Sequence, residues 1–485
     1  MKHGGLFSTL MVAVTLTSSC TTGFQNSVLP RGASNLERRS VAPPAPDRPV
    51  ILMAFSGGGA RAAALAAAVL TKMDGVTYTA SDGRHHLTDD IMLVSSVSGG
   101  SVTAAWLGLY RGDNLGERLA ELKDRFLTQD NMGSLEGNLI NPLFWVREAF
   151  TDYSRIQALQ DLLDKRLFDG KRISEINQPG KPFVIFNASD MAGGETFAFT
   201  PSRFDDICSD FDSMRLSTAV AASAAFPIAL TPVTFKDFQK GCPGNIRDAR
   251  WAEIEQAAPQ GQLNLAEYRN ARYTNDLRQR EPTFRSIKFV HLLDGGLADN
   301  LGINSIRDAL SRGSDDTHLL QEINLGHVRK LVVIVVNARS DPPNELYEKQ
   351  DASGIFGQFA AITSAPIDAN SLNAQQNIDR LLLEMARAAV EAPNTDIALQ
   401  VYNVTVDFDT IAADTPAHRA LRDAVKAIPT SWNINADQLS TIDQASALIL
   451  DNDGCYRQLL ADLKATGGPQ SPLSTGCKTR VTKPH

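Results

Sequence analysis

The stretch VILMAFSGGGAR at residues 50–61 decides the fold of this chain. An apolar run ends in three glycines and passes into an alanine-rich segment, residues 60–70, which predicts a buried strand, a tight turn and a helix. Such a turn leaves backbone N–H groups unpaired at the positive end of the helix dipole. Gly57, Gly58 and Gly59 therefore predict a nest for an anion, either a phosphate or the oxyanion of an acyl-transfer intermediate.

A second strand, turn and helix follow further along the chain, where an apolar run at residues 91–94 leads into SSVSGGS at residues 95–101. A nucleophile elbow needs small residues two before and two after its serine, because strand and helix backbones nearly touch there. Ser96 and Gly100 meet this requirement around Ser98, which is the candidate nucleophile. The alternative is a solvated Ser/Gly-rich turn at the end of a strand.

A third predicted strand, residues 287–293, runs directly into Asp294-Gly295-Gly296. In open α/β sheets, ligand sites form at the carboxyl ends of the strands. Asp294, Ser98 and the glycine loop are therefore expected on the same edge of one sheet. The alternative is three unrelated turns, and it requires each turn to carry a suitable polar residue by accident.

With these segments in this order, the chain resembles the patatin-like phospholipase family, whose pattern is a G-G-G-x-R loop, a G-x-S-x-G elbow and a D-G-[GA] turn. The resemblance spans residues 49–337 and includes the stretches at 183–190 and 221–227. It implies an α/β fold with three α/β/α layers around a mainly parallel central sheet. It also implies a serine lipid acyl hydrolase that uses a Ser-Asp dyad without histidine.

Carried over to this sequence, the resemblance makes Ser98 the nucleophile, Asp294 the base and the three glycines the oxyanion loop. Arg61 is the arginine of the loop motif, and it could hold the loop or contact a phosphate headgroup; we favour the first role. Two residues depart from the family pattern: Ser56, where many members have an acidic residue, and Ser96, in place of glycine. Neither departure removes a catalytic group.

The rival mechanism is the Ser-Asp-His triad of α/β-hydrolases, which needs a histidine after the acid. His318, His327 and His418 follow Asp294, but none stands in a strand-end Gly or Asp context. His291 lies within the predicted strand, where a role in the core or in support of the site is expected. A carboxylate alone can activate the serine if burial raises its proton affinity.

Composition agrees with a large enzyme that does not bind nucleic acid. The 485 residues are 43% hydrophobic, enough for a large core, and the net charge of −8 argues against a nucleic-acid partner. Basic residues do not cluster strongly, so contact with a membrane surface is expected through a lipid anchor or apolar residues. We expect no cofactor and no metal site.

The N-terminus has the pattern of a secretory signal, with Lys2, an apolar core at residues 6–16 and small residues before Cys20. It resembles a bacterial lipoprotein signal, in which residues 1–19 are removed and Cys20 is acylated; an ordinary signal peptide is the alternative. Residues 20–48 then predict a flexible tether. The expected location is the bacterial cell envelope, on the periplasmic side of the outer membrane, or outside the cell.

Export permits disulfides, and four cysteines remain besides Cys20. The simplest pairing joins Cys208 with Cys242 and Cys455 with Cys477. Their spacing does not fit a zinc site.

The expected organisation is a catalytic domain at residues 49–340 and a C-terminal extension, 341–485, packed on it. The extension predicts a helix over residues 377–390 and a strand over 397–406. Residues 136–153 predict either an apolar lip over the site or core packing. Residues 241–285 predict an insertion between two strands.

The sequence thus predicts an exported hydrolase resembling phospholipase A or lysophospholipase, acting on carboxylic esters of membrane lipids. Transfer of the acyl group to an acceptor other than water would use the same acyl-enzyme. A catalytically silent or partner-gated lipid-binding envelope protein is the alternative from a different class.

Overall fold

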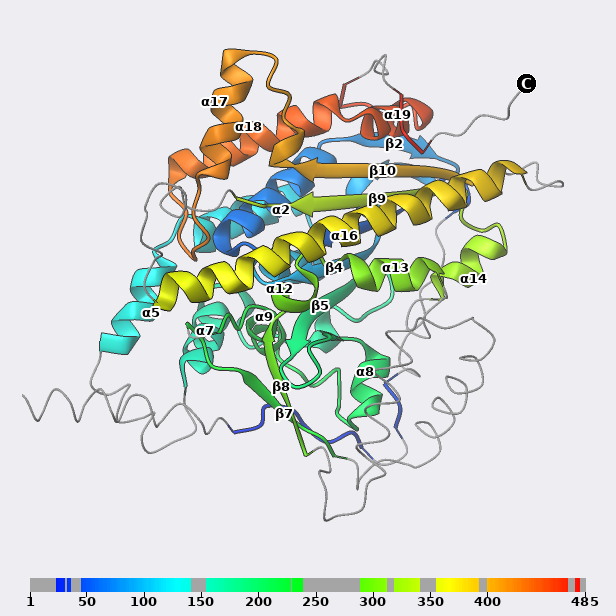
Figure 1. Cartoon of the computed structure of the whole chain (residues 1–485). Helices are drawn as coiled ribbons and strands as arrows, with labels where there is room; N and C mark the ends of the chain where they lie inside the picture. Colours follow the sequence, from blue (N-terminus) through cyan, green and yellow to red (C-terminus); the bar gives the residue numbers. More distant parts are fainter. Residues whose placement is uncertain are drawn as a thin grey trace, which may run out of the picture.

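The computed structural model describes residues 23–30, 33–35, 45–140, 154–227, 229–238, 288–311, 318–340, 355–391, 399–469 and 476–479. These residues build a large, mainly parallel sheet with helices on both faces (Figure 1). The sheet contains β1 (Pro49–Phe55), β4 (Ile91–Val97), β5 (Phe183–Asp190), β6 (Thr196–Ala198), β7 (Val233–Lys236), β8 (Phe289–Asp294), β9 (Lys330–Asn337) and β10 (Gln400–Asp407). A separate hairpin consists of β2 (Thr77–Ala80) and β3 (Gly83–His86).

The strand order in the large sheet is β10-β9-β1-β4-β5-β8-β7, and β6 pairs with β5. The five strands from β10 to β5 are parallel, whereas β6 and β8 are antiparallel to β5. The helices are α2 (Gly59–Asp74), α3 (Gly99–Tyr110), α4 (Leu115–Leu122), α5 (Asn131–Ile140), α7 (Arg155–Leu163), α8 (Pro201–Asp206), α9 (Leu216–Ser223), α12 (Gly296–Asp299), α13 (Ile303–Ser311), α14 (Leu319–Asn324), α16 (Ile355–Glu391), α17 (Pro416–Lys426), α18 (Ala436–Asn452) and α19 (Gly454–Asp462).

Strand β1 separates two apolar cores, because successive side chains of a strand point to opposite faces. Met53 and Phe55 face the core shared with α2, α3 and α18, whereas Leu52 and Ala54 face the core shared with α13 and α16. Figure 1 shows α16 and α13 crossing one face of the sheet. The architecture is the three-layer α/β/α fold expected from the sequence.

The C-terminal part of the chain belongs to this same sheet. Strand β10 pairs with β9 in parallel along its whole length, α16 covers one face, and α18 packs against α2 on the other. The helix predicted over residues 377–390 extends much further, from Ile355 to Glu391, with Pro366 inside it. A boundary at residue 340 therefore cuts through a continuous sheet.

The described residues before β1, at 23–30 and 33–35, form a strap packed on the domain, so the flexible-tether prediction is wrong there. The side-chain amide of Asn26 donates to the Lys236 carbonyl at 2.9 Å and accepts the Lys236 N–H at 2.8 Å. The amide of Asn35 donates to Asp205 at 2.6 Å. The prolines and the scarcity of large apolar residues predict a tether. However, an asparagine side chain can both donate to and accept from a backbone, and so replace the hydrogen bonds of a neighbouring strand.

Cys455 and Cys477 form a disulfide, one of the two pairings expected from the sequence. Cys208 is also disulfide-bonded, while Cys20 and Cys242 lie outside the described residues. So do the predicted signal segment, most of the predicted lip and the predicted insertion at 241–285. Within the described part of the chain, no helix is long and apolar enough to cross a membrane, and no cluster of side chains could hold a metal ion.

Candidate active site

Ser98 occupies a strained turn between β4 and α3. Its φ of 51° and ψ of −121° lie where residues other than glycine rarely occur, at a cost of roughly 1–3 kcal/mol. The turn is possible because Gly100 lacks a side chain: a Cβ there would lie 2.7 Å from the Ser56 carbonyl oxygen. These are the features of a nucleophile elbow, which aims its serine out of the end of a strand.

Ser96, which replaces the usual first glycine of the elbow, is accommodated by hydrogen bonds. Its hydroxyl donates to the Ile185 carbonyl at 3.1 Å and accepts from Ser101 at 3.1 Å. This fully buried hydroxyl thus both donates and accepts a hydrogen bond, as burial requires. The departure from the family pattern leaves the turn intact.

Asp294 reaches Ser98 from an antiparallel strand. Val97 pairs with Asn187 of β5, and Asp294 pairs with the next residue of β5, Ala188, on its other side. The Ser98 hydroxyl donates to Asp294 Oδ2 at 2.9 Å. The basis for expecting Asp294 beside Ser98 is wrong, because β8 is antiparallel to β5 and is not one of the parallel strands that end at the carboxyl edge of the sheet. Strand β8 runs inward from beyond this edge and stops at it.

The Asp294 carboxyl is buried and has few partners. Its Oδ1 accepts the Gly296 N–H at 2.8 Å, and the Ser189 hydroxyl fixes the Asp294 carbonyl at 2.8 Å. Burial raises the pKa of Asp294 to about 6, and the hydrogen bonds from Gly296 and Ser98 offset only part of this rise. The group can therefore accept a proton near neutral pH.

No histidine bonds to Ser98 or Asp294 among the described residues. His291 pairs with Thr234 at 3.0 Å, His327 with Glu322 at 2.7 Å, and His418 with Asp414 at 2.6 Å. The described geometry contains a Ser-Asp pair and offers no support for a triad.

The glycine loop presents fewer free donors than the sequence suggests. The Gly57 N–H donates to the Asn300 carbonyl at 2.9 Å and is therefore occupied. In the part of the chain that the structure describes, no acceptor receives the N–H of Gly58 or Gly59, which lie at the start of α2. These two groups are the candidate oxyanion donors in this loop.

The Arg61 guanidinium bonds to residues of the C-terminal half of the chain and not to Ser98 or Asp294. It donates to the carbonyls of Ala338, at 2.8 Å, and Ile428, and to the Thr430 hydroxyl at 3.1 Å. The side chain is buried, and burial lowers its pKa to about 10. This geometry favours the loop-holding role over contact with a headgroup.

Two supporting contacts were not foreseen from the sequence. The Ser431 carbonyl accepts the Ala60 N–H at 2.7 Å, which ties the segment between α17 and α18 to the residue after the glycine loop. The Ser98 N–H donates to the Ser223 hydroxyl at 2.8 Å. Ser223 lies in the small-residue run at 221–227, which is part of the family resemblance and could have indicated this contact. Nothing in the sequence near Ser431 marks the role of that residue.

Comparisons with known proteins found one family model and several solved structures that resemble this chain. The family model described as patatin-like phospholipase matches residues 53–306. The structure is similar to human GIVD cytosolic phospholipase A2, with a TM-score of 0.41, 10% identity, and 86% of this chain and 62% of that chain covered. For the same human enzyme in complex with methyl gamma-linolenyl fluorophosphonate, the TM-score is 0.40 and the identity 11%. The similarity covers 86% of this chain and 59% of that chain.

This chain therefore spans less than two thirds of the length of those human chains. No curated protein matches it significantly. The family model covers more than half of the 485 residues and includes the glycine loop, Ser98 and Asp294. The chain belongs to the patatin-like phospholipase family.

Proposed function

We propose that this protein is a serine lipid acyl hydrolase that cleaves carboxylic ester bonds of membrane lipids, with Ser98 as nucleophile and Asp294 as base. The observation that carries the proposal is the 2.9 Å hydrogen bond to a buried carboxylate from the hydroxyl of Ser98, a residue with a strained backbone. A protein that only binds lipid needs neither the strain nor the burial.

In the proposed reaction, Asp294 takes the hydroxyl proton as Ser98 Oγ attacks the ester carbonyl carbon. The N–H groups of Gly58 and Gly59 stabilise the negative oxygen of the tetrahedral intermediate, and the loss of one such donor typically costs about 3 kcal/mol. Asp294 then passes the proton to the leaving alcohol, which leaves an acyl-enzyme. Water, activated by the same carboxylate, releases the fatty acid.

The pKa of Asp294 suits this role. A carboxyl with a pKa of about 6 is mostly ionised at neutral pH, yet it binds a proton more readily than an exposed aspartate does. Activity is therefore expected to rise with pH through about 6.

The test is labelling with a fluorescent fluorophosphonate, followed by measurement of fatty-acid release from phospholipids and triglycerides. We expect labelling of the wild type and none of Ser98→Ala or Asp294→Asn. Replacement of His291, His318, His327 or His418 should leave turnover within about tenfold. Loss of turnover with any one histidine would restore the triad, and a folded wild-type protein that takes no label would favour the lipid-binding alternative.

We also propose that the protein is exported and held to a membrane by an acylated Cys20, which lies outside the described residues. The supporting observation is the sequence pattern of residues 1–20. Cys20→Ser is expected to move the protein from the membrane fraction to the soluble fraction. Unchanged partition of this variant would refute the anchor and leave the hydrolase proposal standing.

A further inference from the structure

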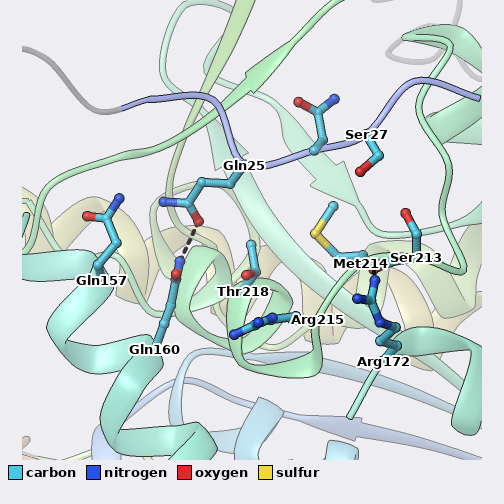
Figure 2. Close-up of a pocket in the computed structure, with 10 residues that line it drawn as sticks. Gln25, Ser27, Gln157, Gln160, Arg172, Ser213, Met214, Arg215 and Thr218 are labelled. Carbon is cyan, nitrogen blue, oxygen red and sulfur yellow. Dashed lines mark hydrogen bonds between the residues drawn. The ribbon is translucent and has the colours of Figure 1, made fainter. Parts of the chain in front are cut away.

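A cavity lies between the N-terminal strap and helices α7 and α9, and neither Ser98 nor Asp294 lines it (Figure 2). Its volume is about 340 Å³. Gln25 and Ser27 of the strap form one wall, Gln160 of α7 and Thr218 of α9 contribute to it, and Arg172 and Arg215 lie opposite the strap. None of the residues that line it belongs to the proposed catalytic groups.

The charge of this cavity opposes that of the protein as a whole. Arg172 and Arg215 are its charged lining residues, and no lining residue is acidic, although the chain carries a net charge of −8. Asp164 lies 3.3 Å from Arg215, whose side chain remains 58% exposed. Among the described residues, the Arg172 guanidinium has no carboxylate partner and donates to the Ser213 carbonyl at 2.5 Å, while the Arg172 backbone N–H donates to Glu175 Oε1 at 3.2 Å.

The backbone places the two arginines directly opposite each other. They form an antiparallel bridge, flanked by hydrogen bonds from Ile173 to Met214 and from Leu216 to Lys171. This is the non-hydrogen-bonded type of pair, in which the side chains lie closest. Like charges in directly opposed positions destabilise a pair of strands. An anion bound between the two guanidinium groups would remove this repulsion.

The neutral groups of the cavity supply further donors. Gln25 accepts a hydrogen bond from Gln160 at 2.6 Å, while its own buried Nε2 finds no acceptor among the described residues. Thr218 adds a hydroxyl at the cavity wall. Two guanidinium forks surrounded by amide and hydroxyl donors match the oxygen-rich surface of a phosphate.

We propose that this cavity binds the phosphate group of a phosphate ester. The ester could be a phospholipid headgroup or a soluble compound. The sequence favours a lipid source, because the strap that forms one wall begins three residues after Cys20, the proposed anchor. The site is also connected to the catalytic elbow: α9 lines the cavity at Thr218 and ends at Ser223, whose hydroxyl accepts the Ser98 N–H.

The experiment uses full-length Ser98→Ala protein, so that no substrate is consumed. Calorimetric titration with inorganic phosphate and with glycerol 3-phosphate measures soluble ligands. Co-sedimentation with phosphatidylcholine vesicles, with and without phosphatidylglycerol, measures lipid headgroups. We expect Arg172→Gln or Arg215→Gln to weaken binding at least tenfold and the double variant to abolish it. Arg84→Gln, which changes an exposed arginine elsewhere, should bind normally.

Loss of binding to glycerol 3-phosphate in the variants supports a soluble ligand, and loss of binding only to phosphatidylglycerol vesicles supports a headgroup. Binding that is absent from the start, or that the arginine variants do not change, overturns the proposal. Thr218→Val gives a second variant, which keeps both charges and should weaken binding to a smaller extent. Thermal melts without ligand guard against misfolding, since removal of one arginine should leave the protein as stable or slightly more stable.

Discussion

Replacement of Asp294 by asparagine should abolish activity and, at neutral pH, stabilise the fold. In the folded protein the pKa of Asp294 is about 6, against an ordinary value of 3.8. Folding therefore favours the protonated carboxyl. The contribution of the protonated Asp294 to stability is complete below pH 4 and is lost as the pH rises through about 6. The difference between the folded and ordinary pKa values corresponds to a total loss of about 3 kcal/mol.

The asparagine introduced by Asp294→Asn would have no charge to bury and could keep both hydrogen bonds. Its carbonyl oxygen can accept the Gly296 N–H that Oδ1 now accepts, and its NH₂ can donate to the Ser98 oxygen. The variant should therefore exceed the wild type in free energy of unfolding by a margin that grows with pH and levels off above about pH 6, reaching roughly 3 kcal/mol.

The assay is urea denaturation of both proteins at about pH 4.5 and about pH 8. Ser98→Ala is the control, because it is equally inactive but keeps the buried carboxyl, and it should show no such pH-dependent gain. If the difference in unfolding free energy between Asp294→Asn and the wild type is the same at both pH values, the pKa of Asp294 is not raised and this carboxyl is not suited to act as the base.

Three further predictions concern the elbow and the loop behind it. Ser98→Gly should be more stable than Ser98→Ala by about 1 kcal/mol in thermal melts, because glycine tolerates a φ of 51°; equal stability would mean that the turn is not strained. Gly100→Ala should lower fluorophosphonate labelling at least tenfold, since its Cβ would lie 2.7 Å from the Ser56 carbonyl oxygen. Gly476→Ala, which meets nothing within 4 Å, is its control. Thr430→Val removes an acceptor of Arg61 and should lower kcat about tenfold at unchanged KM, with Thr430→Ser restoring it. A change in KM alone would assign Thr430 to substrate binding.

The parts of the site that the sequence could predict are those with a local signature. Three glycines after an apolar run, a serine between small residues and an aspartate before two glycines each imply a turn, because only small residues fit where strand and helix backbones meet. The antiparallel direction of β8 was beyond such reasoning. A strand that ends in aspartate looks the same in either direction, and direction is set by pairing with β5 across the sheet.

Contacts made through backbone atoms could not be predicted from the sequence either. The Asn300 carbonyl that occupies the Gly57 N–H, and the Ser431 carbonyl that receives the Ala60 N–H, would be present with almost any residue at those positions. The prediction for the strap failed for a different reason. Its composition is typical of a linker, but the side chains of Asn26 and Asn35 bind specific partners. Composition describes the average tendency of a segment, whereas two well-placed amides are enough to fix it.

The acceptors of Arg61 show why the C-terminal part of the chain belongs to the proposed catalytic machinery. Ala338, Ile428 and Thr430 all lie outside the family match at residues 53–306, although Arg61 is part of the family's loop motif. Among the described residues these acceptors include no carboxylate, so the buried guanidinium depends on them to replace its lost hydration. Without the segment at 428–430, a buried charge would be left partly unpaired directly beneath Gly58 and Gly59. The loop that is proposed to stabilise the oxyanion would then have to move to let Arg61 reach water.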